Sequence, residues 1–454
     1  MAAIISTQFR VLNAFNFKEE VGQSGVSLYL GIGKPDAWSN SLSDLTDTIP
    51  FVPYDNFDHA NEAKQNLIGL KKITTADVSH VIPRYNWALG STYTPWDSDD
   101  SDIYDKSFYI ITDEFKVYKC IVAGTSGSTI KPTQTQISPL AEADGYTWKY
   151  MYTLAVADAE KFLTTSYVPV KSVSEDFVDD AAAEAALSEA DYAQYLNQKA
   201  SRASAAAAGI ERIEIVDGST GYSSAPTITI TGDGTGATAT CTISGGVVNN
   251  ITVTNKGTGY TVAHIAFSSG DASARCVIAP KGGHGTDPRG ELGAFFVGIN
   301  TTLDGLEGQD ITVDNDFRQV TLIKNPTLGG SLITSATINP LKYLDITSAG
   351  ITGTINVDEV IVGGTSNAKA LIANVDTSLG RIYYTQNSKT GYTAFQGSEA
   401  VTSSINGGSA VLEATPSVTG EMDLTSGELL FLENRESINR SLSQIEDLKM
   451  IVEF

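Results

Sequence analysis

Residues 144–153 read "DGYTWKYMYT", and aromatic residues occupy every second position within them. They are Tyr146, Trp148, Tyr150 and Tyr152. Because side chains alternate between the two faces of a strand, this spacing predicts one strand with all four rings on one face. Such a row of rings forms a protein core, a subunit interface or a platform for sugars. We expect core packing, because large exposed apolar patches are rare, and we keep the other two as alternatives.

Composition and charge limit the possible partners. The chain has 454 residues, of which 41% are hydrophobic and 18% are charged, as is typical of globular proteins. Its length suits roughly two to four domains. The 53 acidic and 30 basic residues give a formal net charge of −23. Because this charge repels phosphate backbones and anionic bilayers, we expect neither nucleic acid nor a membrane as a partner.

The cysteines and the N-terminus indicate where the protein is made. Cys120, Cys241 and Cys276 are an odd number of cysteines without zinc-site spacing, so we expect buried thiols in a reducing cytosol. A bridge between Cys241 and Cys276 stays open, because it depends on geometry. The N-terminus lacks the basic start and the long apolar stretch of a signal peptide.

Three segments have clear patterns of secondary structure. Residues 107–124 predict a hairpin, with "TDE" between two β-rich runs. Residues 61–70, "NEAKQNLIGL", carry apolar residues at helical spacing. Residues 174–208 form the long helix candidate, with Ser174 as its cap and Gly209 as its stop. The apolar face of this alanine-rich segment is thin, so we expect it to lie on the surface or to pack against another chain.

The composition shifts to Gly, Thr, Ser, Ala and Val from residue 210, and the sequence then repeats itself. Residues 218–243 resemble 256–278, each with a glycine turn, a strand, a second glycine turn and a second strand. A weaker pair of repeats consists of 355–375 and 395–415. We interpret the two pairs as two small β modules, each built from two related hairpins.

The sequence offers no catalytic, cofactor-binding or metal-binding motif. "KGGHGTD" at 281–287 places His284 among glycines, and we interpret it as a flexible turn rather than a metal ligand or a base. "WDSDDSD" at 96–102 lacks the order of a calcium loop and predicts a solvated acidic loop. "TGDGTGA" at 231–237 lacks the lysine of a phosphate-binding loop and predicts a hairpin turn. We therefore expect no enzyme activity and no cofactor, although paired carboxylates of a glycoside hydrolase would leave no local signature.

Six stretches, in the same order, resemble the gene-eight-type baseplate wedge subunit of T4-like contractile-tailed bacteriophages. They are "GKPDAWS" at 33–39, "VIPRYNW" at 81–87, "VYKC" at 117–120, "DGYTWKY" at 144–150, "FRQVTLIKNP" at 317–326 and "SGELLFLENR" at 426–435. The candidate interface or structural residues lie in them: Trp38, Arg84, Trp87, Tyr146, Trp148, Tyr150, Arg318, Asn325, Glu433 and Arg435.

Two of these stretches predict specific contacts. Pro83 forces an extended path, and Arg84 beside it would pair with a carboxylate across a buried turn or serve an interface. Glu433 and Arg435 would help to order the C-terminal strand.

The patterns and the resemblance together predict an α+β, mainly β, multidomain protein with a discontinuous core domain. The core would comprise residues 1–209, ending in the alanine-rich helix, together with 292–340 and 418–454. Residues 210–291 and 341–417 would be two inserted β modules, since they have no counterpart in the family.

The resemblance also implies a function. Family members are non-enzymatic parts of the tail baseplate wedge, associate as homodimers and clamp onto other wedge proteins. The chain would then be a structural subunit of the virion tail baseplate, synthesised in the host cytoplasm. The alternative from another class is a tail-associated receptor- or glycan-binding protein whose β modules bind the host. A depolymerase is a weaker third alternative, because only two pairs of repeats are present.

Overall fold

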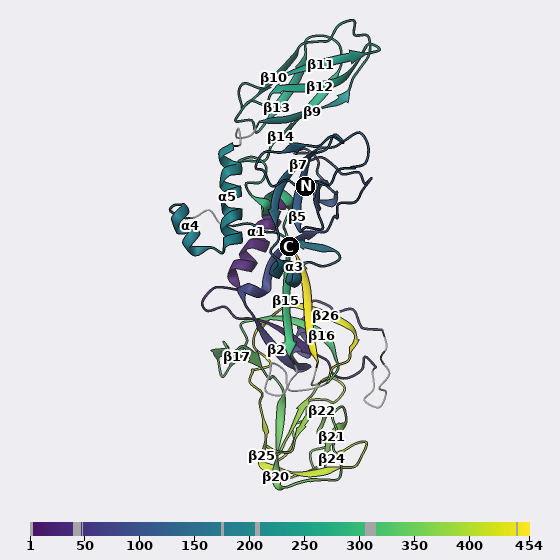
Figure 1. The fold of residues 1–454 in the computed structure, drawn as a ribbon. Coiled ribbons are helices and arrows are strands. Elements are labelled where there is room, and N and C mark those ends of the chain that lie inside the picture. Colours follow the sequence, from purple (N-terminus) through teal and green to yellow (C-terminus); the bar gives the residue numbers. More distant parts are fainter. Residues whose placement is uncertain are drawn as a thin grey trace. The chain divides into compact units, whose positions relative to one another are not determined.

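The computed structural model describes residues 3–39, 47, 49–173, 177–204, 209–304, 315–441 and 444–454. Strands make up 40% of these described residues and helices 15%, which confirms the predicted α+β, mainly β class. The chain forms two compact units, each assembled from separate stretches of sequence (Figure 1). Unit 1 contains Met1–Asn16, Ser79–Gly298 and Ile451–Phe454, and unit 2 contains Phe17–Val78 and Ile299–Met450. The division into a core with two insertions stays a prediction.

An antiparallel sheet with the order β4-β5-β7-β6 lies in unit 1. Its strands are β4 (Tyr109–Ile111), β5 (Lys116–Val122), β6 (Leu140–Ala141) and β7 (Thr147–Thr153). β4 and β5 form the hairpin predicted at 107–124, with Ile110 opposite Tyr118. Buried branched and aromatic side chains fit this pleated surface and stabilise the pairing.

The segment predicted as one long helix contains two helices, α4 (Asp180–Ala186) and α5 (Glu189–Ser204), so the single-helix prediction is wrong. The Ser188 hydroxyl accepts a hydrogen bond from the first turn of α5, and this cap divides the alanine-rich run. Asp179 caps α4, whereas the predicted cap, Ser174, lies outside the described residues. The other helical elements that begin in unit 1 are α1 (Thr7–Glu20), η2 (Ile103–Asp105), α3 (Val156–Phe162) and α6 (Pro288–Leu292).

The first β module of unit 1 consists of three antiparallel strand pairs (Figure 1). Its strands are β9 (Ile210–Asp217), β10 (Ile228–Gly232), β11 (Thr238–Ser244), β12 (Val247–Asn255), β13 (Ala263–Phe267) and β14 (Ser273–Ile278). The predicted hairpin within each repeat is not formed, because β10 pairs with β13, β11 with β12 and β9 with β14. Only β10 and β13 pair between the two repeats, whereas β11 and β14 pair with β12 and β9, which lie outside both repeats.

A shared apolar interior explains this pairing. A lone two-stranded hairpin buries too little surface to be stable, whereas the three strand pairs together enclose one apolar interior. Tyr260 and Cys276 of the second repeat pack there with Ile210 and Ile213 of β9. Cys241 of β11 is half-buried, and all three cysteines are free thiols, so the bridge left open is not formed.

A five-stranded antiparallel sheet with the order β19-β2-β1-β16-β26 lies in unit 2. Its strands are β1 (Leu28–Gly33), β2 (Leu67–Ile73), β16 (Phe317–Lys324), β19 (Thr337–Ile338) and β26 (Glu428–Ile438). The helix predicted at 61–70 is wrong in its second half, because α2 (Phe57–Gln65) ends before Leu67 begins β2. Leu67 and Leu70 are buried in a strand that pairs on both sides, and this pairing overrides the local helical spacing.

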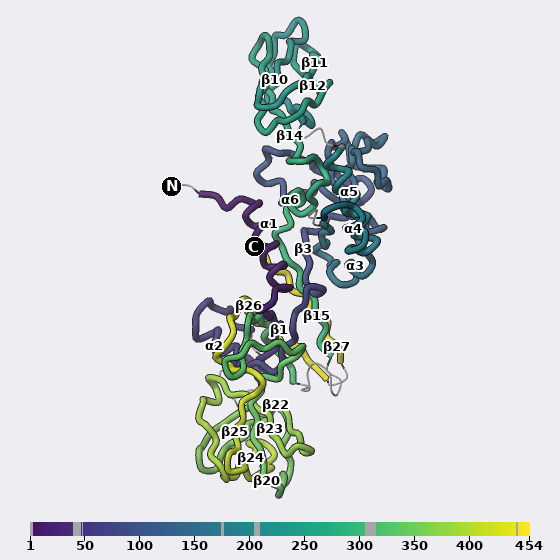
Figure 2. Tube along the Cα trace, turned by 90° about the vertical axis from the view of Figure 1, so that its left-hand side faces the viewer, coloured from purple at the N-terminus to yellow at the C-terminus, as the bar shows by residue number. Residues whose placement is uncertain are grey.

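Six strands of unit 2 close into a barrel with the order β20-β23-β22-β21-β24-β25 (Figure 2). They are β20 (Lys342–Thr352), β21 (Val360–Gly363), β22 (Lys369–Asp376), β23 (Arg381–Thr385), β24 (Ala400–Ser403) and β25 (Ser409–Val418). β21 with β22 and β24 with β25 are the two related hairpins predicted at 355–375 and 395–415, which confirms them.

Each of these hairpins is fixed by a buried carboxylate from the other repeat. Glu399 accepts hydrogen bonds from the backbone of Thr365 and Ser366, at 2.9 and 2.8 Å. Glu359 accepts hydrogen bonds from the side chains of Ser403 and Asn406 in the opposite turn. The reciprocal contacts hold the two turns of the barrel in place.

The remaining strands belong to a sheet with the order β27-β15-β3-β8 and to a short pair, β17 with β18. Their bounds are β3 (Val78–Pro83), β8 (Tyr167–Pro169), β15 (Phe296–Asp304), β17 (Thr327–Leu328), β18 (Ser331–Leu332) and β27 (Ile445–Glu453), and η1 covers Thr75–Asp77. The chain passes from one unit to the other within α1, β3, β15 and β27.

Candidate functional site

The loop after β1 carries the first family-like motif, "GKPDAWS", in unit 2. Lys34 has a left-handed backbone, with φ 61°, and a Cβ atom on Gly33 would lie 2.8 Å from the carbonyl oxygen of Asn66. This tight turn brings the Asp36 carboxylate to 2.5 Å from Lys34 Nζ and 2.6 Å from Lys389 Nζ. Burial opposes ionisation, yet the two ammonium groups hold the pKa of Asp36 below its ordinary value.

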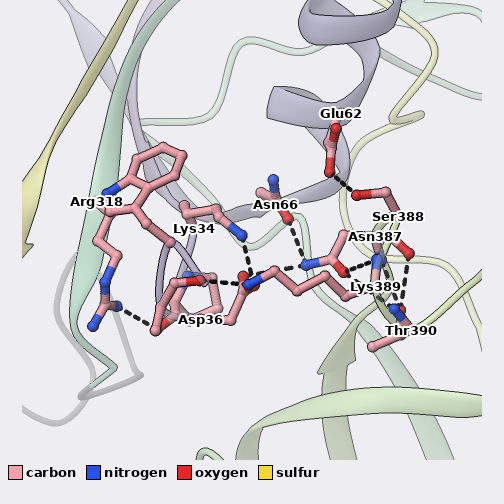
Figure 3. A network of polar contacts seen from close by, with 12 residues as sticks. Lys34, Asp36, Glu62, Asn66, Arg318, Asn387, Ser388, Lys389 and Thr390 are labelled. Atoms are coloured by element: carbon pink, nitrogen blue, oxygen red, sulfur yellow. Dashed lines mark hydrogen bonds and ion pairs between the residues drawn. The ribbon is translucent and has the colours of Figure 1, made fainter. Parts of the chain in front are cut away.

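The loop between β23 and β24 of the barrel binds this motif loop (Figure 3). The side-chain amide of Asn387 donates to Asp36 Oδ1 and to Asn66 Oδ1, both at 3.2 Å. Ser388 Oγ donates to Glu62 Oε1 of α2 at 2.5 Å. Because these polar groups satisfy one another inside the chain, the network fixes the barrel loop to the motif loop.

Arg318 fixes the other side of the motif loop. Its Nε and Nη2 atoms each lie 2.7 Å from an oxygen of Asp47, and Nη1 donates to the Pro35 carbonyl at 2.5 Å. These hydrogen bonds hold the pKa of Asp47 below its ordinary value. The Trp38 indole donates to the Arg435 carbonyl at 2.8 Å. The structure therefore brings together three predicted residues, Trp38, Arg318 and Arg435, around one loop.

The other two predicted residues of unit 2 lie on β26 and at the end of β16. Asn325, with φ 53°, exchanges two hydrogen bonds with the Ser27 backbone, at 2.7 and 2.8 Å. Asparagine tolerates this left-handed conformation better than most residues, so it suits the turn. Glu433 lies on β26 opposite Val320, within the ladder that orders this strand. A role for these residues in an interface stays a prediction.

The aromatic row of β7 belongs to unit 1, and most of it is core. Trp148 is 0% exposed and packs against the rings of Tyr146, 5.6 Å away, and Tyr93, 5.4 Å away. The half-buried Tyr150 packs against the same cluster. This arrangement agrees with the expected core packing of the rings.

The fourth ring departs from the predicted face. Tyr152 packs in a different cluster, because Met151 has no partner on β5 and forms a β-bulge that reverses the alternation of side chains. The prediction of one common face is therefore wrong for Tyr152. The Met151 carbonyl instead accepts hydrogen bonds from the amides of Gln194 and Asn197, at 3.3 and 3.2 Å, so α5 packs on this strand of its own chain.

Two further predicted residues lie near this sheet. Trp87 packs against the Trp148 cluster and donates its indole N–H to Ser128 Oγ at 3.2 Å. Arg84 donates to Asn86 Oδ1 at 2.8 Å and to the Thr164 carbonyl at 2.6 Å. These partners are an amide and a carbonyl, so the predicted carboxylate pairing is wrong; neutral acceptors fix this extended segment.

A comparison with protein families finds a match for the N-terminal part of the chain. The family model described as "Bacteriophage T4, Gp8" matches residues 3–125. This part of the chain, less than a third of the 454 residues, is similar to the Gp8 family. The Gp8 family is that of the T4 baseplate wedge subunit. No curated protein matches the chain.

The Gp8 match includes Trp38, Arg84 and Trp87 but not Arg318 or Lys389. The motif loop at 33–39 therefore depends on partners from outside the matched segment. Sequence reasoning missed Lys389 and Asn387, because nothing in the barrel repeats distinguishes that loop from an ordinary turn.

Sequence reasoning also missed a buried charged cluster on the other face of the β5–β7 sheet. Lys119 and Lys149 lie directly opposite each other on these strands. Lys119 Nζ is 2.9 Å from Glu291 Oε2 of α6, and the two side chains are 0% and 4% exposed. Lys149 donates to Ser201 Oγ of α5 at 2.9 Å, and burial lowers its pKa to about 8. The sequence did contain a signal for this cluster, because Lys119 and Lys149 lie next to aromatic residues within predicted strands.

His284 lies in the same cluster, so its interpretation as part of a flexible turn is wrong. Its ring is buried, with Nε2 3.7 Å from Glu211 and Nδ1 3.9 Å from Glu291. The glycines of the loop allow this packing, because a Cβ atom on Gly285, with φ 89°, would lie 2.5 Å from the Lys149 side chain. Burial, reinforced by nearby cations, lowers the pKa of His284 well below its ordinary value.

We expect His284 to make the protein less stable in acid. Its folded-state pKa is depressed, whereas the unfolded chain titrates near 6.5. Below about pH 6.5 the unfolded state binds a proton that the folded state does not, which lowers the free energy of unfolding by up to about 1.4 kcal/mol per pH unit. In urea unfolding between about pH 7.5 and 4.5, the variant His284→Gln should not show this decrease in the free energy of unfolding. Parallel stability curves for the two proteins would contradict this assignment.

The acidic loop at 96–102 is also more ordered than expected. Asp97 is buried and forms an ion pair with Arg275 of β14, and Arg212 Nη2 of β9 lies 3.7 Å away. Asp100 pairs with Lys106 at 2.5 Å. The prediction of a solvated loop is wrong for Asp97, because guanidinium groups from the β module compensate its burial.

Two kinds of feature are absent from the described ranges. No group of three or more His, Cys, Asp or Glu side chains there is arranged to hold a metal ion. Nor is any helix in those ranges long and apolar enough to cross a membrane.

Proposed function

We propose that this chain is a structural subunit of a phage tail baseplate wedge that assembles through protein–protein contacts and catalyses no reaction. The Gp8 match over residues 3–125 carries the proposal. The geometry supports it, because the charged groups around the motif loop pair within the chain and the rings of β7 fill cores. These side chains stabilise the subunit instead of presenting a reactive group.

The proposal includes homodimerisation and binding to other wedge subunits in the virion tail. The net charge of −23 disfavours nucleic acid and membrane surfaces as partners. The N-terminal segment supports self-association, because Phe9 and Leu12 of α1 are exposed, as is Ile5, which lies two residues before the helix begins. Gln8 and Asn16, exposed on the same side, are uncharged. Two such stripes, antiparallel across a twofold axis, would place Phe9 near the axis and Ile5 against Leu12 of the second copy.

Light scattering on the purified chain tests this dimer. We expect a dimer that strengthens or stays unchanged as salt is added, because salt screens the repulsion between two copies of charge −23. The double variant Phe9→Ser/Leu12→Ser should dissociate at roughly 100-fold higher concentration, since four half-buried apolar side chains are lost per dimer.

Leu89→Ser serves as the control, because Leu89 is an exposed leucine elsewhere in unit 1. A wild-type chain that stays monomeric at tens of micromolar would remove the dimer from the proposal. Tight binding of the isolated chain to a host glycan would instead favour the receptor-binding alternative.

A further inference from the structure

A short segment of unit 2 exposes an unusual amount of apolar surface. Residues 49–57, "IPFVPYDNF", carry five large hydrophobic side chains, which are 51–89% exposed. The three aromatic rings alone expose on the order of 400 Å², if a whole aromatic side chain contributes about 200 Å². Soluble proteins rarely leave contiguous patches larger than a few hundred Å² uncovered unless something binds there.

The backbone of this segment is held in place. The Asn434 amide donates to the Phe51 carbonyl at 2.8 Å, and the Tyr54 N–H donates to His59 Nδ1 at 3.3 Å. Pro50 and Pro53 restrict the chain further. The exposed rings are therefore displayed on an ordered support, which reduces the entropy lost when a partner binds.

A cavity of about 510 Å³ lies beside the segment, a size within the usual range of binding pockets. Phe51, Val52 and Tyr54 form part of its wall, together with Trp38 and Leu432. Gln319 also lines it, and its buried Oε1 has no hydrogen-bond partner in the described part of the chain. A buried acceptor without a partner is costly, so this cavity is suited to a side chain that brings an N–H or O–H donor.

The charges around the segment indicate the kind of partner. Asp55, Asp58 and Glu62 border the exposed rings in the sequence, with no Lys or Arg between Lys34 and Lys64. The two lysines that line the cavity, Lys34 and Lys389, are both paired with Asp36. A second copy of this chain would bring the same carboxylates to a symmetric contact and repel. An apolar surface with lysines or arginines at its rim would complement both the rings and the carboxylates.

We propose that residues 49–57 and the adjoining cavity form the docking surface for a different protein, whose apolar side chains are rimmed by lysine and arginine. The inference rests on the proposed function, because it requires an assembly in which this chain is a subunit. It goes beyond that function by naming the surface and the chemistry of the neighbour.

Hydroxyl-radical footprinting of the isolated chain and of intact tails tests the proposal. Oxidation of Phe51, Tyr54 and Phe57 should fall roughly fivefold or more in tails, as burial of most of each ring requires. Equal oxidation in both samples would overturn the proposal. Protection that already appears in the isolated chain as its concentration rises would assign the surface to a second copy and overturn it as well. If tails do not contain the chain, the proposed function fails instead.

Variants provide an independent test that does not depend on oxidation. Val52→Ser/Phe57→Ser should leave the melting temperature unchanged but reduce incorporation into tails roughly a hundredfold in competition with the wild type. Asp55→Lys/Asp58→Lys should also be outcompeted, and the loss should shrink at high salt. Leu379→Ser, at another exposed site in unit 2, should compete equally. Normal incorporation of both double variants would contradict the docking surface.

Discussion

Replacing Lys119 with methionine is expected to lower the free energy of unfolding by about 3–5 kcal/mol, because it leaves the buried Glu291 carboxylate without its ammonium partner. Lys119 Nζ lies 2.9 Å from Glu291 Oε2, and both side chains are almost completely buried. Burial lowers the pKa of Lys119, and Glu291 opposes that shift by stabilising the ammonium form. The Lys119 ammonium also lies 3.8 Å from the Trp96 ring, which adds a cation–π contact.

The double variant Lys119→Met/Glu291→Gln separates the charge effect from packing. A neutral pair of similar volume should recover part of the lost stability, because the variant no longer buries a carboxylate without its ammonium partner. Urea unfolding followed by tryptophan fluorescence is a suitable measurement, since Trp87, Trp96 and Trp148 all belong to unit 1. A single variant that loses less than about 1 kcal/mol, or a double variant that recovers nothing, would contradict the assigned pair.

Trp148→Ala is expected to destabilise unit 1 by about 3–5 kcal/mol, as for other large side chains removed from a packed core. The indole is 0% exposed and lies between the rings of Tyr93 and Tyr146. Its buried Nε1 has no hydrogen-bond partner within the described ranges, so Trp148→Phe should cost much less, about 1–2 kcal/mol.

Tyr150→Ala is the matched control on the same strand, because Tyr150 is only half-buried and makes an edge contact with Tyr118 at 5.8 Å. Its loss should be clearly smaller than that of Trp148→Ala. Circular dichroism in a urea series measures all three variants. Equal losses for Trp148→Ala and Tyr150→Ala would indicate that the row acts as one surface and not as a core.

The sequence predicts the strands of this region better than their pairing. The spacing of aromatic residues at every second position correctly placed Tyr146, Trp148 and Tyr150 together. No local pattern, however, signals the β-bulge at Met151 that places Tyr152 in another cluster. The bulge depends on contacts with β5 and α5, which are distant in sequence. Pairing between the repeats of the first β module has the same origin, since a shared interior decides it.

The predicted helix boundaries were wrong for two different reasons. The break before α5 was visible in the sequence, because Ser188 followed by Asp191 is a capping pattern inside the alanine-rich run. The end of α2 was not visible, because Leu67 and Leu70 fit a helical stripe as well as a strand. Only pairing with β1 and β19 decides that they form β2.

The motif residues were identified from the resemblance, but their partners were not. Trp38, Arg318 and Arg435 come from three of the family-like stretches, and the fold brings them together around one loop. Lys389, Asn387 and the buried Lys119 could not be recognised, because each acquires its role from a charge that only the folded chain brings near. A buried charge has the same sequence signature as a solvated one.

The central claim is that the chain is a structural subunit of a tail baseplate. Electron microscopy of intact virions with a gold-labelled antibody against this chain tests it most directly. The account predicts label at the distal end of the tail, in the same amount on every particle. Label on the head or the tail shaft, or particles that lack the chain altogether, would contradict it.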